Sequence, residues 1–158
     1  MKLINITDVK TFMYCILIKD MFDNFLLEDA SITTYNTFNI DGHIVKSYFT
    51  DEEYSNIPEE LSYWRSMKPI CYDLIKGKIT PVKFKFILKA DSKLTASLLE
   101  ENSLSFSPKD IGGLYINIRY ENNTLDCISA TNLNLFTLDK SLENVWDEYV
   151  KKFLGPLS

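Results

Sequence analysis

The chain has 158 residues, of which 46% are apolar, 17 are Lys or Arg and 22 are Asp or Glu, for a net charge of −5. This composition excludes a disordered, collagenous or low-complexity chain. A chain of this length buries roughly 68–70% of its unfolded surface, so it needs no disulfide or metal to fold. The acidic balance argues against a dedicated DNA-binding domain, which is usually basic. We expect one domain over residues 1–158.

Apolar periodicity predicts a helix near the N-terminus, over residues 8–22, with apolar side chains at i, i+3, i+4 and i+7. Residues 25–40 are then rich in β-forming side chains, and Asp41-Gly42 separates them from a second β-prone run at 43–49. Because Asp-Gly is a preferred pair in type I′ turns, we predict a hairpin turn at Asp41-Gly42. A loop over residues 50–63 with one or two helical turns follows, and then a short helix that starts near Pro69 and ends near Gly77.

Residues 81–89 alternate apolar and mostly charged side chains, the pattern of a strand with one buried and one wet face. The next predicted helix is capped by Asp91 or Ser92. An amphipathic C-terminal helix starts after Asp139 or Ser141 and ends at Gly155-Pro156. Between these two helices the pattern predicts three consecutive strands, over residues 114–120, 125–131 and 133–138.

This order of elements predicts an α+β fold. Strands joined by short turns favour an antiparallel sheet, here of about five or six strands, and the intervening helices are expected to pack on one face of it. The chain lacks the regular alternation of strand and helix that is typical of a doubly wound parallel sheet.

The sequence predicts a cytoplasmic protein without membrane contact. Its longest uncharged apolar run is Phe12–Ile18, whereas a membrane-spanning helix needs about 20 residues. The N-terminal residues lack the apolar core of a signal peptide. Cys15, Cys71 and Cys127 are too far apart in sequence to indicate a zinc site, and we interpret them as buried structural thiols.

Several segments resemble an uncharacterised family of small proteins from Clostridia-like bacteria. The resemblance spans nearly the whole chain, and no activity is assigned to that family. It therefore implies a bacterial protein and supplies no functional residues. The segments that carry it are Tyr35–Gly42 (YNTFNIDG), Leu74–Pro81 (LIKGKITP), Phe136–Leu142 (FTLDKSL), Trp146 and Lys151–Leu154 (KKFL).

Motifs for catalysis are absent from the sequence: it has no glycine-rich phosphate loop, no nucleophile elbow and no metalloprotease motif. The single histidine, His43, follows the predicted turn, where side chains are usually solvated. The acidic runs Asp51–Glu53 and Glu59-Glu60 lack the spacing of a calcium loop, and we interpret them as a solvated segment. The sequence thus predicts no catalytic residue, no cofactor and no metal.

Charge segregation is the one feature that points to a function. Residues 74–90 carry a charge of +5 without any acid, the rest of the chain carries −10, and residues 20–60 alone carry −9. If the strand at 81–89 aligns its lysines on one face, they form a stripe that suits an anionic partner. Alternatively, the stripe is a solvated face or a protected sheet edge, or it lies against the acidic 20–60 region in the same chain or in a homodimer. The stripe comprises Lys76, Lys78, Lys83, Lys85 and Lys89.

We therefore expect a non-enzymatic binding or interaction protein whose lysine stripe contacts an acidic protein, a phosphorylated ligand or a nucleic acid. The double charge reversal Lys83→Glu/Lys85→Glu should abolish that binding. The first alternative is a small-molecule-binding domain with an apolar, aromatic pocket between sheet and helices. The second is an enzyme without a recognisable motif, with converging carboxylates around Asp41 or His43.

Overall fold

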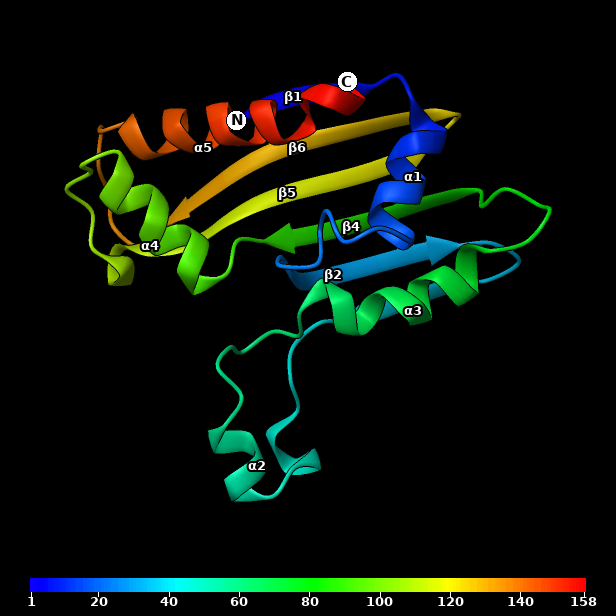
Figure 1. Ribbon diagram of the computed structural model, residues 1–158, viewed down its shortest axis with the longest axis horizontal. Coiled ribbons are helices and arrows are strands. Elements are labelled where there is room, and N and C mark those ends of the chain that lie inside the picture. The colour runs from blue at the N-terminus through cyan, green and yellow to red at the C-terminus, as the bar shows by residue number, and fades with distance from the viewer.

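Six antiparallel strands form one sheet, in the order β1-β6-β5-β4-β2-β3, in a computed structural model that describes residues 1–158 (Figure 1). The strands are β1 (Lys2–Ile6), β2 (Leu26–Thr33), β3 (Thr37–Asp41), β4 (Lys83–Lys89), β5 (Ile111–Glu121) and β6 (Thr124–Leu133). The helices are α1 (Val9–Leu17), α2 (Asp51–Ser55), α3 (Trp64–Ile75), α4 (Ser92–Glu101) and α5 (Ser141–Leu154). The predicted α+β class and antiparallel sheet are confirmed.

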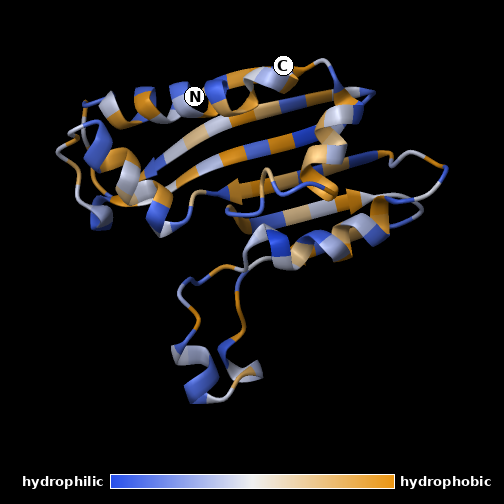
Figure 2. Cartoon of the chain, in the orientation of Figure 1, coloured by the Kyte–Doolittle hydropathy of each residue, from blue (hydrophilic) through white to orange (hydrophobic).

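One face of the sheet carries the core. In β4, Phe84, Phe86 and Leu88 are buried, and the residues between them point to the opposite side. The alternating colours along the strands in Figure 2 follow this period of two. A cluster of 28 buried side chains fills the space between this face and the helices. The helices α1, α3, α4 and α5 lie over this one face, as the sequence predicted (Figure 1).

The C-terminal helix α5 is anchored to the sheet by an aromatic side chain. Trp146 is fully buried, and its indole Nε1 donates a hydrogen bond to the Tyr115 carbonyl oxygen at 2.9 Å. The predicted amphipathic helix is confirmed, although its N-cap is Lys140, without a capping side chain. The Asp139 carboxylate accepts a hydrogen bond from the Ser141 amide just before the helix.

The prediction of a hairpin turn at Asp41-Gly42 is wrong. The hairpin pairs β2 with β3, so its turn lies at residues 34–36, and residues 43–49 form no strand. Gly42 serves another purpose. A Cβ atom there would lie 1.6 Å from the Leu27 carbonyl oxygen, so the close approach of these two backbones requires a glycine.

The predicted strand over residues 133–138 is also absent, since β6 ends at Leu133. The sheet position that this strand would take beside β6 is occupied by β1, with Lys2 opposite Ser129 and Ile6 opposite Leu125. The sequence pattern did not predict β1, because its five residues give too short an alternation to recognise.

Two helix boundaries differ from the predictions as well. The first helix ends at Leu17, before residue 22, and α3 begins at Trp64, with Pro69 inside it. Trp64 fixes the start of α3 because its ring is fully buried and its indole Nε1 donates to the Ile16 carbonyl oxygen at 2.7 Å. The predicted helix capped by Asp91 is α4, where the Asp91 side chain accepts from the Leu94 amide.

Residues 42–63 form an arm that projects away from the sheet, with α2 at its tip (Figure 1). At its base the Ser62 amide donates to the Gly42 carbonyl oxygen at 2.9 Å, which holds the two sides of the arm together. At its tip Thr50 and Glu53 form a capping box on α2. None of the helices of the molecule combines the length and the apolar character needed to cross a bilayer.

Candidate functional site

The face of the sheet opposite the helices presents polar side chains from every strand. On β4 these are Lys83, Lys85 and Lys89, together with Ile87, so the predicted alignment of three lysines along one strand face is present. The phenylalanines between these residues anchor the strand on the core side, and this fixes the direction in which the lysines point.

Strand register places a further cation beside these lysines. Lys85 lies directly opposite Arg119 on β5, and both side chains are solvent-accessible. No carboxylate lies within ion-pair distance of Lys83 or Arg119. Like charges in directly opposite positions destabilise a sheet. We call Lys83, Lys85 and Arg119 the cationic cluster.

The cationic cluster surrounds a shallow hollow of about 190 Å³. Ser31 on the neighbouring strand β2 and Glu121 on β5 also line it. Ser31 faces Lys85 across the β2–β4 pairing, so a hydroxyl lies next to the central lysine. The arrangement supplies three cationic groups and a hydroxyl, and hence can bind an anionic group by charge-assisted hydrogen bonds.

Acidic side chains interrupt the positive charge on this face. Asp29 Oδ2 lies 3.9 Å from Lys85 Nζ. Glu121 is opposite Lys83, and Asp126 is opposite Arg119. One alternative expected from the sequence was that the acidic 20–60 region lies beside the basic strand. Only Asp29 of that region lies within ion-pair distance of a lysine of β4, whereas the acidic tip of the arm lies far from the sheet (Figure 1). The surface is a local cationic spot and not a continuous basic stripe.

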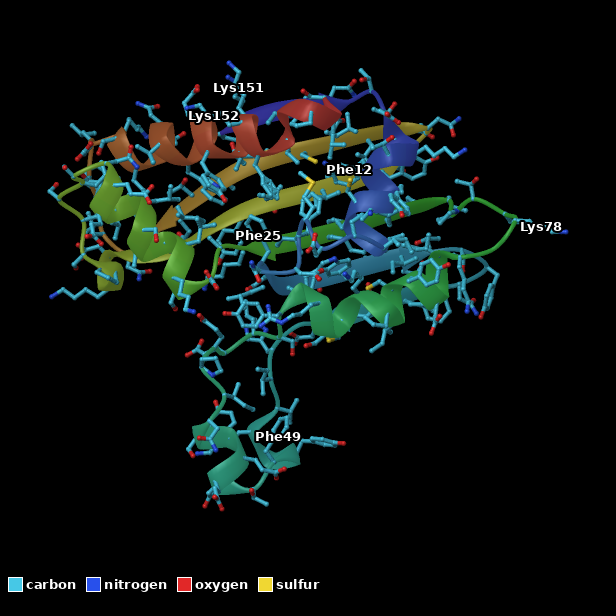
Figure 3. All side chains as sticks on the ribbon, in the orientation of Figure 1. Phe12, Phe25, Phe49, Lys78, Lys151 and Lys152 are labelled. Carbon is cyan, nitrogen blue, oxygen red and sulfur yellow. The ribbon has the colours of Figure 1, made fainter.

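The other lysines of the predicted stripe have separate environments. Lys89 lies over the Tyr115 ring, with Nζ 5.9 Å from the ring centroid. Lys76 directly follows α3, and its Nζ lies 3.0 Å from Asp73 Oδ1. Lys78 lies at the tip of the loop between α3 and β4 (Figure 3). Lys76 and Lys78 line another cavity of about 430 Å³, together with apolar side chains such as Ile79.

His43 is exposed, as predicted, and belongs to no cleft of converging carboxylates. Its Nδ1 lies 2.7 Å from Asp41 Oδ1, and this hydrogen bond raises the pKa of His43 above its usual value. The hydrogen bond that the His43 amide donates to Asp41 Oδ1 lowers the pKa of Asp41, and the contact with the His43 ring lowers it further. No cluster of three His, Cys, Asp or Glu side chains has the geometry to hold a metal ion.

Two of the three cysteines are buried, as predicted. Burial raises the pKa of the thiols of Cys71 and Cys127 to about 12, so both remain protonated and unreactive at neutral pH. Cys15 is only partly buried, and all three are free thiols.

A third cavity lies on the opposite, helix-covered side of the sheet, between the segment before β2 and the helices α3, α4 and α5. Its volume is about 450 Å³, and it contains Asp91, which is only 6% exposed. Sequence reasoning expected an aromatic pocket between sheet and helices only as an alternative and named no residue for it. It identified Asp91 solely as a helix cap and missed Arg119. The lining of the cavity and the place of Arg119 both depend on contacts between segments distant in sequence, for which the chain alone gives no signal.

Fold and site together define a small α+β protein with an antiparallel sheet, helices on one face and a cationic cluster on the other. The chain belongs to DUF5721, a family of unknown function whose model matches residues 15–157. This confirms the predicted membership of an uncharacterised family, whereas the predicted bacterial origin stays a prediction. No curated protein and no solved structure matches the chain.

Proposed function

We propose that this protein binds a phosphorylated ligand through the cationic cluster on the open face of its sheet. The observation that carries the proposal is the register that sets Lys85 directly opposite Arg119. Asp29, at 3.9 Å from Lys85, offsets the repulsion between these two cations only in part, and Arg119 forms no ion pair, so a bound anion would attract both side chains.

The dimensions of the hollow favour a phosphoryl group. At about 190 Å³ it is smaller than the roughly 300–1,000 Å³ of pockets that enclose whole drug-sized molecules. The planar guanidinium of Arg119 offers a two-pronged contact to phosphate oxygens, and the ammonium groups of Lys83 and Lys85 add point charges. The Ser31 hydroxyl supplies a further donor at the side of the hollow.

A long polyanion fits this face less well. Asp29, Glu121 and Asp126 lie next to the cations, and they would repel the successive phosphates of a nucleic acid or the carboxylates of an acidic protein. Nucleic-acid binding also depends on neutralising many phosphates along a basic surface. Among the partners expected from the sequence, the phosphorylated ligand is therefore the one that the geometry supports.

Isothermal titration with inorganic pyrophosphate tests the proposal. The variants Lys85→Glu/Arg119→Glu and Lys83→Glu/Lys85→Glu should bind about tenfold more weakly or not at all, because each replaces two attractive charges by repulsive ones. The matched control is Lys151→Glu/Lys152→Glu, which makes the same change of charge on exposed residues of α5, away from the open face (Figure 3). The control should bind like the wild type.

Equal affinity of the wild type and the cluster variants would overturn the proposal. A parallel titration uses polyglutamate and a single-stranded oligonucleotide. If either polymer binds while pyrophosphate does not, the ligand class is wrong.

The proposal includes a cytoplasmic location. Its support is chemical: the protein carries three free cysteines, which suits a reducing compartment. Fractionation of cells that express the full chain would test this, and recovery outside the cytoplasm would contradict it.

A further inference from the structure

The helix-side cavity, on the face opposite the cationic cluster, combines an aromatic wall with converging polar groups. It lies among four segments that are distant in sequence. Its volume of about 450 Å³ is in the range of small-molecule sites. It is lined by Met21, Asn24, Phe25, Tyr63, Arg65, Asp91, Lys93, Leu94, Ser97, Tyr149 and Phe153.

The aromatic wall is a stack along α5. The rings of Trp146 and Tyr149 are nearly parallel, with centroids 5.4 Å apart, and those of Tyr149 and Phe153 are 6.1 Å apart. Phe25 meets Phe153 edge-on at 5.3 Å. Tyr149, Phe153 and Phe25 all line the cavity, so a planar ring bound there would have aromatic surfaces to pack against.

A buried carboxylate supplies the inner polar contact. One oxygen of Asp91 accepts from the Leu94 amide, and the other accepts from the Tyr63 hydroxyl at 2.9 Å. Burial and the nearby Asp91 raise the pKa of Tyr63 to about 12, so this phenol stays a donor at neutral pH. A carboxylate offers about four acceptor positions. Asp91 therefore retains the capacity to accept from a ligand.

Two exposed cationic side chains, those of Arg65 and Lys93, line the cavity. The Arg65 guanidinium lies 4.0 Å above the Tyr63 ring, and its Nη1 donates to the Asp23 carbonyl oxygen at 3.1 Å, which holds the side chain in place. Lys93, in the first turn of α4, is exposed and forms no ion pair within the protein. Arg65 and Lys93 thus place positive charge outside the aromatic wall.

We infer that the helix-side cavity binds a small molecule made of a planar aromatic ring and an anionic group. The ring packs against Tyr149 and Phe153 and donates to Asp91, and the anion faces Arg65 and Lys93. This site is distinct from the cationic cluster, which lies on the other face of the sheet and shares no lining residue with it.

Ligand-observed NMR with matched probes tests this inference. Adenosine 5′-monophosphate is compared with adenosine and with ribose 5-phosphate, which carry the ring alone and the anion alone. Likewise 4-hydroxyphenylacetate is compared with its neutral amide. All measurements are repeated in the Lys85→Glu/Arg119→Glu variant, so that binding to the cationic cluster does not contribute.

A variant whose new side chain fills the cavity gives the decisive test. Ser97 is exposed on α4 and lines the cavity, so Ser97→Trp occupies the space without touching the core. Ser47→Trp, on the projecting arm, is the matched control. We expect saturation transfer to at least one aromatic anion in the wild type and in Ser47→Trp, and its loss in Ser97→Trp.

Lys93→Gln should weaken binding of the anionic probe several-fold while leaving its neutral counterpart unchanged. This variant removes an unpaired exposed charge and so does not endanger the fold. Comparing adenosine 5′-monophosphate with 4-hydroxyphenylacetate shows whether the cavity prefers a phosphate or a carboxylate as the anionic group. If neither aromatic anion binds the wild type, or if binding persists in Ser97→Trp, the inference is wrong.

Discussion

Position 42 requires a glycine because a larger side chain has no room there, and not because of its backbone conformation. Its missing Cβ makes room for the Leu27 carbonyl oxygen, whereas the glycine with a positive φ is Gly77. We expect Gly42→Ala to lower the free energy of unfolding by about 2 kcal/mol or more, because one of the two backbones must move. Urea denaturation measures the effect. Gly155→Ala, which meets nothing within 4 Å, is the control and should stay within about 1 kcal/mol of the wild type.

His43 and Asp41 form a pH-sensitive pair at the base of the arm. Because the Asp41 carboxylate raises the pKa of His43, an NMR titration should give a value above the ordinary 6.5 or so. In Asp41→Asn the pKa of His43 should fall back toward that value. An unchanged pKa in this variant would show that the 2.7 Å contact is not formed in solution.

The sign of the linked stability change follows from this shift. A pKa that is higher in the folded state adds stability that is fully present below the unfolded pKa of His43 and is lost as the pH rises through the folded value. Since the side chains of His43 and Asp41 are 56% and 76% exposed, solvent screens the pair and the contribution is small.

At the scale of elements, α5 should depend on Trp146 for its attachment to the sheet. Trp146→Phe removes the hydrogen bond to the Tyr115 carbonyl and should cost about 1–3 kcal/mol of unfolding free energy. Trp146→Ala also leaves a large cavity and should cost about 3–5 kcal/mol. Asn144→Ala, on the exposed side of α5, should change stability by less than about 0.5 kcal/mol. Similar values for all three variants would contradict the packing described for α5.

Elements with a strong local pattern could be predicted from the sequence. The alternation in β4 and the apolar stripe of α5 both reflect one buried face, and each is visible within its own segment. The prediction of a turn at Asp41-Gly42 failed for a related reason. A dipeptide preference is a local signal and takes no account of the Leu27 backbone, which lies against Gly42. The strand predicted at residues 133–138 failed because β1 occupies the neighbouring position in the sheet.

At the scale of the whole molecule, the candidate sites arise from contacts that no single segment encodes. The sequence placed Lys83, Lys85 and Lys89 on one face through the period of two, but the pairing of Lys85 with Arg119 depends on the register between β4 and β5. The helix-side cavity draws on residues from Met21 to Phe153 and was even less accessible to sequence reasoning. The charge segregation in the sequence thus predicted the lysine-bearing strand β4 but not the other residues that complete the site.

A titration of the 15N-labelled protein with pyrophosphate, followed by NMR, tests the role of the cationic cluster most directly. We predict saturable shifts of the backbone amides of residues 83–87 and 117–121, with α5 and the helix-side cavity unchanged. The shifts should disappear in Lys85→Glu/Arg119→Glu and persist in Lys151→Glu/Lys152→Glu. Shifts confined to another surface, or none at millimolar pyrophosphate, would contradict a phosphate-binding role for the open face of the sheet.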